Sequence, residues 1–505
     1  MARHETDPSE IRTFLSIHGH FYQPPREDPF TGIVRPEFGA DPFNDFCEKI
    51  NAECYRPNAA LGNFRRLSFN VGPTLADWLH RHDRETHDAI IASDAWSVQR
   101  TGVGSAMAQA YSHTILPLAT QQEKRIQIAW GLADFAHRFG RRPEGMWLPE
   151  TAVDTETLAV MADFGIEFTI LAPWQAGNEV DSTSPYLVRL PGRRSISACF
   201  YDAPLSGQAS FNPIMTVDAV RFTRDHLLAR RNVDKLARGE PQLLMIATDG
   251  ELYGHHQPFR DHFLSYLLSK AVPSVGFGVI TPGSYLRQFP ARLETTIRDA
   301  TSWSCAHGVR RWRDDCGCTE GDGSWKWHLR HAFNRLAARI DSAFEINLEG
   351  YFPDPWLALE DYLSVRTGTV SWADFSQRHN ARSIESLDHS ILVGFFEAQY
   401  HRQIMFMSCS YFFEDLDRLE PRAAIARAAR AISLIEASSN IKLTNSFVSD
   451  LAHARSNRSP LTGADLYRQV LPGHMETQAL VGRSGSVRNS GRSTSERPAF
   501  CLGAD

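Results

Sequence analysis

The chain has 505 residues, which at roughly 150 residues per domain is enough for two to four domains, or for one large barrel with an appended domain. Its 42% hydrophobic and 22% charged residues exclude a chain that is disordered throughout, a fibrous protein and a coiled coil. The 53 basic and 59 acidic residues give a formal charge of -6, too close to neutral for a protein that binds nucleic acid or an anionic membrane.

The sequence contains no run of eighteen apolar residues, and its first residues lack the basic and apolar segments of a secretion signal. We therefore expect a cytoplasmic protein with no membrane partner. Eight cysteines are few for this length, and thiols stay reduced in such a compartment. No structural disulfide is expected.

Short apolar runs alternate with amphipathic stretches over the first three hundred residues. The apolar runs predict strands at residues 14–17, 68–71, 145–148, 166–171 and 243–247. The last of these is apolar on both faces, as a buried parallel strand is. This rhythm predicts an α/β fold built as a parallel barrel.

Helical patterns lie between the predicted strands. One helix is expected to carry Leu75, Trp78 and Leu79 on its buried face, and another to begin after Asp154 and to stop at Gly165. Strands and helices therefore alternate, as parallel barrel units require.

Polar side chains follow three of the predicted strands. They are His18 and His20, then Glu150, then Asp249. The carboxyl ends of all strands in a closed parallel barrel meet on one face, so we expect these side chains to converge. Because Gly19 is expected to break the first strand, only one of the two histidines should face the centre of the site.

The pattern changes beyond about residue 290, where long helical periods replace the strand signals. The clearest of these helices are predicted at residues 325–344, 390–413 and 421–437. We expect a barrel over residues 1–290, a helical domain over 291–471 and a disordered Ser/Gly/Arg-rich tail over 472–505.

Five segments carry a resemblance to a known family. HGHFYQPP at 18–25, MWLPE at 146–150 and TDGELYGHH at 248–256 resemble the ordered motifs of glycoside hydrolase family 57. TSWSCAHGV at 301–309 and MSCSYFF at 407–413 resemble the domain of unknown function 3536, which follows the barrel in one subgroup of that family. Three motifs in order, each after a strand, are a specific signal.

The resemblance implies an incomplete (β/α)7 barrel of the glycoside hydrolase/deacetylase type that acts on α-glucans with retention of configuration. It places the nucleophile on Glu150 and the general acid/base on Asp249. No cofactor or metal is expected. Whether the enzyme hydrolyses or transfers, which linkage and chain length it takes, and its oligomeric state are left open.

The remaining site residues are assigned to substrate binding. They are His18, His20, Gln23, Trp147, His256 and Trp303. The family's second motif has no clean counterpart, because the nearest region, residues 104–113, lacks its glutamate.

The residue types agree with this assignment. Retaining glycosidases need two carboxyl groups about 5–5.5 Å apart, one ionised and one protonated. We expect the carboxyl groups of Glu150 and Asp249 to lie within about 5–7 Å of each other. Taken singly, Glu150 could equally favour the dipole of the following helix, and Asp249 could be an ordinary turn residue.

Two other functions remain as alternatives. One is a carbohydrate-binding or regulatory barrel that has lost turnover, and the other is a metal-dependent deacetylase-like hydrolase. The only dense Cys/His group contains Cys305, His307, Cys316 and Cys318. Its spacing is not that of a common zinc ribbon or knuckle, so we expect buried free thiols there.

Overall fold

The computed structural model describes residues 11–382 and 386–472, and the predicted tail lies outside these residues from 473 onward. The chain divides into two compact units. The barrel unit comprises Met1–Gln23, Arg35–Tyr111 and Ile128–Trp303, and the helical unit comprises Pro24–Val34, Ser112–Gln127 and Ser304–Asp505. The division thus falls after Trp303 rather than at residue 290, and two earlier segments belong to the helical unit.

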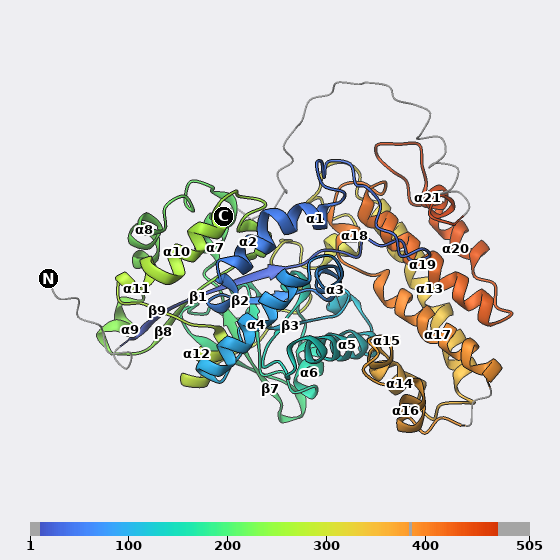
Figure 1. The fold of residues 1–505 in the computed structure, drawn as a ribbon, viewed down its shortest axis with the longest axis horizontal. Coiled ribbons are helices and arrows are strands. Elements are labelled where there is room, and N and C mark those ends of the chain that lie inside the picture. Colours follow the sequence, from blue (N-terminus) through green and yellow to red (C-terminus); the bar gives the residue numbers. More distant parts are fainter. Residues whose placement is uncertain (1–10, 383–385, 473–505) are drawn as a thin grey trace. The chain divides into compact units, whose positions relative to one another are not determined.

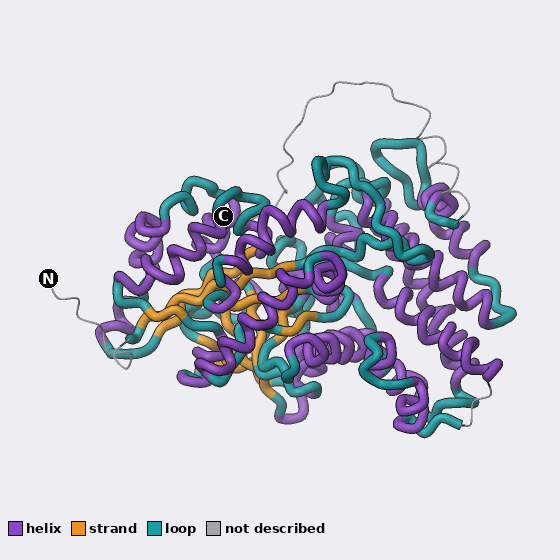
Figure 2. The backbone as a smooth tube through the Cα atoms, in the orientation of Figure 1, coloured by secondary structure: helices purple, strands orange, loops and turns teal. Residues whose placement is uncertain are grey.

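All strands within residues 11–382 and 386–472 belong to the barrel unit, as Figure 2 shows. They are β1 (Thr13–Phe21), β2 (Ser68–Val71), β3 (Ala108–Gln109), β4 (Met146–Trp147), β5 (Phe168–Leu171), β6 (Pro185–Arg189), β7 (Ser195–Phe200), β8 (Gln242–Asp249), β9 (Gly278–Val279) and β10 (Leu293–Thr295). Each strand predicted from an apolar run is present, and β1 and β8 are longer than expected.

The barrel is assembled around β1. This strand pairs in parallel with β8 along almost its whole length and with β2 along its carboxyl half. Parallel bridges from Phe69 to Ala106 and from Gly145 to Phe168 continue the ring from β2 to β3 and from β4 to β5. Parallel ladders join β3 to β4 and β5 to β7.

The ring is open between β7 and β8. The antiparallel strand β6 occupies the second edge of β7, and β10 pairs with β6 in turn. Across the opening, the backbone N–H of Asp202 donates to the carbonyl of Met245 at 2.8 Å. The seven strands β1, β2, β3, β4, β5, β7 and β8 therefore form an incomplete barrel in the described residues, which confirms the predicted fold class.

Helices of the barrel unit connect and cover the strands (Figure 1). They are α1 (Phe46–Ile50), α2 (Arg56–Ala60), α3 (Pro73–His82), α4 (Arg84–Thr101), α6 (Thr155–Asp163), α7 (Ala203–Phe211), α8 (Ala219–Phe222), α9 (Val233–Ala237), α10 (Arg260–Tyr266), α11 (Val272–Ser274) and α12 (Pro282–Gln288). Helix α5 (Gln121–Phe139) begins in the helical unit and ends in the barrel unit. As predicted, the Asp154 side chain caps α6 by accepting from Thr157 N–H at 2.7 Å.

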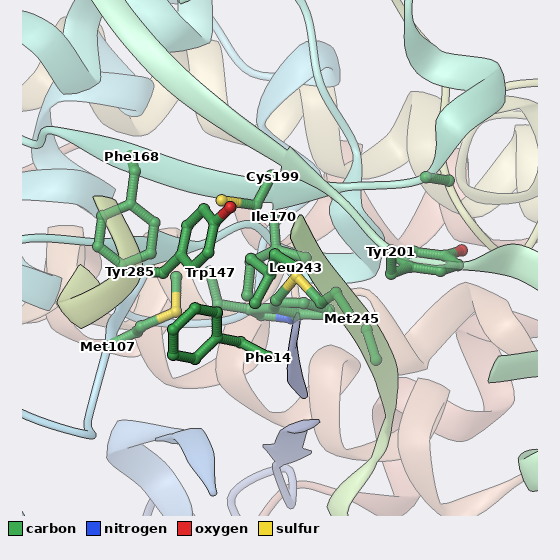
Figure 3. Packing of buried hydrophobic residues seen from close by; sticks show 12 residues of the cluster. Phe14, Met107, Trp147, Phe168, Ile170, Cys199, Tyr201, Leu243, Met245 and Tyr285 are labelled. Atoms are coloured by element: carbon green, nitrogen blue, oxygen red, sulfur yellow. The ribbon is translucent and has the colours of Figure 1, made fainter. Parts of the chain in front are cut away.

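The barrel interior is filled by side chains from several strands. Figure 3 shows Phe14, Met107, Trp147, Ile170 and Met245 packed together. Every second residue of β8, from Leu243 to Ala247, contributes to this cluster. Because side chains alternate along a strand, Asp249 continues the same inward face at the carboxyl end of β8. The core therefore fixes the direction in which the site residues point.

The helical unit is built on long helices that lie side by side in Figure 1. Its helices are α13 (Trp325–Leu348), α14 (Pro355–Asp361), α15 (Leu363–Arg366), α16 (Trp372–Arg378), α17 (Ser386–Ile404), α18 (Cys409–Phe412), α19 (Leu419–Ser438), α20 (Thr444–Leu451) and α21 (Gly463–Gln469). Aromatic rings join α13 to α17, with Phe344 and Phe396 centroids 5.4 Å apart. The helical C-terminal region expected from the sequence is thus present.

The predicted helix over residues 390–413 is wrong at its carboxyl end. Helix α17 stops at Ile404, and α18 starts only at Cys409. Between them, Met407 pairs with Thr114, and Ser408 N–H donates to the carbonyl of His113 at 3.0 Å. This pairing competes with the helical hydrogen bonds and ends the helix.

Among the described residues, no helix combines the length and the apolar character needed to cross a membrane.

Candidate active site at the carboxyl ends of the barrel strands

His18 and His20 lie on the same face of β1. The strand does not break at Gly19, because β1 is paired on both edges there, with Phe69 of β2 and Thr248 of β8. Both imidazole rings stack on the indole of Trp147, with centroids 4.6 and 5.2 Å away. The predicted strand break at Gly19 is therefore wrong, and both histidines point into the barrel, with His18 completely buried.

A hydrogen-bond network between β1, β2 and β3 holds the two histidines. The Oδ1 of Asn70 accepts from Nε2 of His18 at 3.1 Å, and its amide nitrogen donates to Nδ1 of His20 at 3.0 Å. The bond to Asn70 Oδ1 assigns the ring proton of His18 to Nε2, whereas Nδ1 of His20 lies near both polar atoms of Asn70, 3.0 Å from Nδ2 and 3.2 Å from Oδ1. Burial lowers the pKa of His18 to about 3 and that of His20 to about 4, although the hydrogen bonds to Asn70 oppose this. Both rings are neutral at pH 7.

The same network reaches Gln109, which sequence reasoning did not single out. The Oε1 of Gln109 accepts from Asn70 Nδ2 at 2.6 Å. On the neighbouring strand β4, Gln109 has Trp147 as its register partner. Its Nε2 is buried and has no hydrogen-bond partner in the described part of the chain. Gln109 is thus the polar strand-end side chain in the region where the family motif with a glutamate was sought.

Glu150 has a left-handed backbone conformation, which residues other than glycine rarely adopt. It follows β4 by three residues and has φ 57° and ψ 22°, and Thr151 after it has φ 46°. The left-handed region costs roughly 1–2 kcal/mol per residue for a chain of L-amino acids. Such strain persists only where the surroundings over-determine it, and it concentrates at functional sites.

The turn at Glu150 is held from two sides. Gln175 donates from Nε2 to the carbonyl of Thr151 at 2.8 Å and accepts at Oε1 from the Thr151 hydroxyl at 2.9 Å. Trp303 donates its backbone N–H to the Glu150 carbonyl and its indole N–H to Oε2 of the carboxyl group, both at 3.0 Å. An N–H donor of this kind stabilises a carboxylate anion.

Asp249 is placed opposite His20. The two residues are register partners on neighbouring parallel strands, so their side chains point to the same face. Burial, followed by the negative charges of Glu251 and Glu150, raises the pKa of Asp249 well above its usual value. The negative charge of Glu150 acts on Asp249, so the two carboxyl groups lie within electrostatic range of each other. The expected separation of 5–7 Å remains a prediction.

Glu251 is a second buried carboxyl group beside Asp249, and sequence reasoning missed it. Its Oε1 accepts from the Tyr55 hydroxyl at 2.7 Å and from the Tyr22 N–H at 3.2 Å. Burial raises its pKa to about 7, although these bonds and one from Gln23 oppose the shift. Its place two residues after Asp249 in the same motif was the signal that could have identified it.

Gly250 allows the two acidic residues to approach β1. A Cβ atom at this position would lie 2.3 Å from the Phe21 ring. A side chain would therefore push the turn Gly250–Leu252 away from the strand. The glycine in this motif serves close packing.

The other predicted substrate-binding residues occupy different surroundings. His18 and Trp147 have no exposed surface, whereas Trp303 is partly exposed and His256 is exposed. Gln23 hydrogen-bonds Glu251, and His256 neighbours His255.

Aromatic rings continue outward from Trp147. Its indole meets Trp303 edge-on at 5.1 Å, Trp303 meets Tyr201 at 6.3 Å, and Tyr201 meets Trp174 at 6.2 Å. The Trp174 indole is 37% exposed, and its N–H donates to the Ser302 carbonyl at 3.0 Å. An exposed, fixed indole can stack on a sugar ring. Trp174 was not predicted because no motif marks it.

The family comparison agrees with this geometry. Residues 2–298 match the family described as "Glycosyl hydrolase family 57", and residues 322–502 match "Domain of unknown function (DUF3536)". The first match spans more than half of the chain, so the chain belongs to glycosyl hydrolase family 57. The resemblance expected from the motifs is confirmed for both parts of the chain. No curated protein sequence matches it.

Solved structures with the same fold include three enzymes. An exo-type maltose-forming amylase from Pyrococcus sp. ST04 has a TM-score of 0.71 and 15% identity, and the match covers 93% of this chain and 94% of the amylase. A branching enzyme from Pyrococcus horikoshii has a TM-score of 0.57 and 14% identity, with 97% and 99% covered. A 4-alpha-glucanotransferase from Thermococcus litoralis has a TM-score of 0.53 and 16% identity, with 83% and 60% covered. At sequence identities this low, the TM-scores show that the fold is shared and nothing beyond it.

Proposed function

We propose that the protein is a retaining enzyme acting on α-glucans, with Glu150 as nucleophile and Asp249 as general acid/base. The observation that carries the proposal is the contrast between these carboxyl groups. Glu150 receives an indole N–H, which favours its anion, while burial and neighbouring charges raise the pKa of Asp249 and so favour its protonated form. Retaining glycosidases use one ionised and one protonated carboxyl group in this way.

In the first step, Asp249 would protonate the leaving glycosidic oxygen while Glu150 attacks the anomeric carbon. The covalent glycosyl-enzyme would then react with an acceptor deprotonated by Asp249. A water acceptor gives hydrolysis, and a sugar hydroxyl gives transfer. Family membership supports the α-glucan substrate, since the similar structures include an amylase, a branching enzyme and a 4-alpha-glucanotransferase.

The other site residues divide into contacts and supports. Trp174, Trp303 and His256 have exposed surface for a sugar, so we assign them to substrate contact. His18 and Trp147 are fully buried, and we assign them to positioning His20 and the Glu150 turn. The described cysteines form no disulfide with one another, which is compatible with a reducing, cytoplasmic environment.

The central experiment compares two variants on an activated aryl α-glucoside. Glu150→Ala should lose at least about 10⁴-fold in activity on every α-glucan, because the covalent step is removed. Asp249→Ala should still form the glycosyl-enzyme from a substrate whose leaving group needs no proton, and azide should accelerate its turnover with retained configuration. The control is Glu144→Ala, whose carboxylate pairs with Arg141 instead.

Identical azide responses of the two catalytic variants, or an inverted azide product, would exclude this assignment of roles. Product analysis of the wild-type protein with maltooligosaccharides and glycogen then decides between hydrolysis and transfer.

A non-catalytic carbohydrate-binding barrel is the second candidate function. It is favoured by the lack of any carboxylate in residues 104–113, where Gln109 is the polar strand-end residue. This candidate takes over if the wild-type protein binds an α-glucan but neither cleaves nor transfers it. The deacetylase-like alternative loses support, because the one candidate group of metal ligands in the described residues lies in the helical unit.

A further inference from the structure

Residues 304–321 of the helical unit lie between the two family matches, of which the first ends at residue 298 and the second begins at 322, and we consider them together with residues 322–324 as the segment 304–324. Apart from the short 3₁₀ turn Arg310–Trp312, it forms no helix or strand. Long irregular segments in compact proteins need another source of order. This segment nevertheless buries Trp312 and three cysteines.

Four potential ligand atoms converge in this segment. Cys305, His307, Cys316 and Cys318 each offer one ligand atom, and all four atoms lie within 4.8 Å of one another. The sulfur of Cys305 is 3.8 Å from that of Cys316 and 3.9 Å from that of Cys318. The Nδ1 of His307 is 3.4 Å from the Cys318 sulfur.

These distances match a tetrahedral metal site. With metal–sulfur bonds of about 2.3 Å and a metal–nitrogen bond of about 2.0–2.1 Å, tetrahedral angles place two sulfurs about 3.8 Å apart and a sulfur and nitrogen about 3.5 Å apart. A disulfide would instead bring two sulfurs to about 2.05 Å. The arrangement therefore fits a bound ion better than a covalent bridge.

Backbone N–H groups are aimed at two of the sulfurs. The N–H of His307 donates to Cys305, and the N–H of Cys318 donates to Cys316. Each donor lies two residues after its acceptor, and Gly317 makes the second turn possible with φ +72°. Such N–H donors stabilise thiolates, which are the form that binds metal.

Buried positive charge surrounds the sulfurs. Arg311 is 1% exposed, and its Nε and Nη2 have no hydrogen-bond partner in the described part of the chain. Lys326 is fully buried, and the charges of both residues act on Cys316. Asp315 lies close enough to act on Lys326. Together these three side chains leave one net positive charge.

A zinc ion with three thiolates and one neutral imidazole carries one negative charge, which would balance the positive charge left by these side chains. Without a metal, neutral thiols would leave that charge buried with no thiolate to balance it, and the Phe412 ring, 4.5 Å from the Arg311 guanidinium carbon, offsets it only in part. Arg311, with two unpartnered nitrogen atoms, is therefore an independent indication that anionic ligands stand here.

We propose that Cys305, His307, Cys316 and Cys318 bind one zinc ion that fixes the segment 304–324. Four protein ligands leave no open position, so the ion is structural. The three sulfurs are buried and His307 is exposed, which leaves one side for the ion to enter. The inference is independent of the glycosidase assignment, and it replaces the free thiols expected from sequence spacing.

The test uses the full-length chain without a histidine tag, expressed with zinc and analysed for metals. We expect about one equivalent of zinc per chain, falling below about a tenth in Cys316→Ser and in His307→Asn. His307→Cys should retain zinc with four thiolates. Cys409→Ser and His331→Asn are the controls, since they change a cysteine and an exposed histidine of the same unit that lie outside the group of four ligands, and both should keep the full equivalent.

A second measurement protects the test against variants that fail to fold. Chelation of the wild-type protein should expose three additional thiols to alkylation, and cobalt should restore their protection with the absorption bands of a tetrahedral thiolate site. Zinc below a tenth of an equivalent in wild-type protein, zinc retained by His307→Asn and Cys316→Ser, a disulfide among these cysteines, or iron in place of zinc would each overturn the proposal.

Discussion

Trp303 holds Glu150 at two points, with a backbone N–H to its carbonyl and an indole N–H to its Oε2, each at 3.0 Å. The first bond fixes the turn, and the second sets the direction of the carboxyl group. Trp303, the last residue of the barrel unit, thus positions the side chain of Glu150, which lies 153 residues earlier in the sequence.

Trp303→Phe should remove only the second of these bonds, because phenylalanine keeps the backbone N–H and the aromatic ring. A hydrogen bond to a charged group contributes about 1.5–3 kcal/mol, so kcat should fall roughly 10- to 100-fold with little change in KM. Steady-state kinetics measure this. Trp174→Phe is the matched control, since its indole donates to the Ser302 carbonyl instead of a carboxylate. An equal fall in both variants would contradict the role given to the bond.

The pH dependence of kcat/KM tests whether Glu251 acts on the general acid Asp249. The negative charge of Glu251 raises the pKa of Asp249, so Glu251→Gln should lower that pKa and move the alkaline limb of kcat/KM to lower pH. The sign follows because the acid must be protonated to act. Glu53→Gln, which affects a carboxylate paired with His255, should leave the limb in place. An unmoved limb in Glu251→Gln would show that Glu251 does not act on the acid.

The two stacked histidines should stay neutral in mildly acidic solution. An exposed histidine titrates near 6.5, whereas burial lowers the pKa of His18 to about 3 and that of His20 to about 4. Nitrogen NMR of the imidazole rings should show both in a neutral form at pH 5, with the His18 proton on Nε2, assigned with His18→Gln and His20→Gln. Protonation of either ring near pH 6.5 would contradict the network built on Asn70.

Gly250→Ala should destabilise the barrel unit. The new methyl group would meet the Phe21 ring at 2.3 Å, and overpacking of this kind costs about 1–3 kcal/mol. Thermal unfolding should shift to lower temperature, and Phe21→Leu should restore part of the loss by making room. Gly350→Ala is the control, since a Cβ atom there meets nothing within 4 Å. Equal stability of Gly250→Ala and wild type would refute the packing argument.

Much of the fold follows from local patterns. The strand Ser68–Val71 has its predicted bounds, and the strand Phe168–Leu171 ends where its predicted run ends but starts two residues later. The errors arise where distant segments decide. Gly19 stays in a strand because two neighbouring strands pair with it, and α17 ends where Met407 pairs with Thr114. No window of sequence contains both partners of such pairs.

The residues of the candidate site likewise divide into those that local sequence patterns predict and those that only the folded chain reveals. His20, Glu150 and Asp249 could be predicted together because strand ends converge in a parallel barrel. Trp174 and Gln109 could not, since their importance depends on neighbours such as Tyr201 and Asn70 that only the folded chain supplies. Glu251 stood beside a predicted residue, but its burial against Tyr55 comes from the fold.

The consecutive left-handed residues Glu150 and Thr151 also bear on how this lineage evolves. A glycine or asparagine at position 150 would relieve the backbone strain, so selection for stability should favour such a replacement in a descendant with no turnover. Selection for a carboxylate at this position acts in the opposite direction. Homologous chains that keep the barrel can therefore be sorted by the residue at this turn: an acidic residue marks those still under selection for catalysis, and a small or amide residue marks those that have become binding proteins.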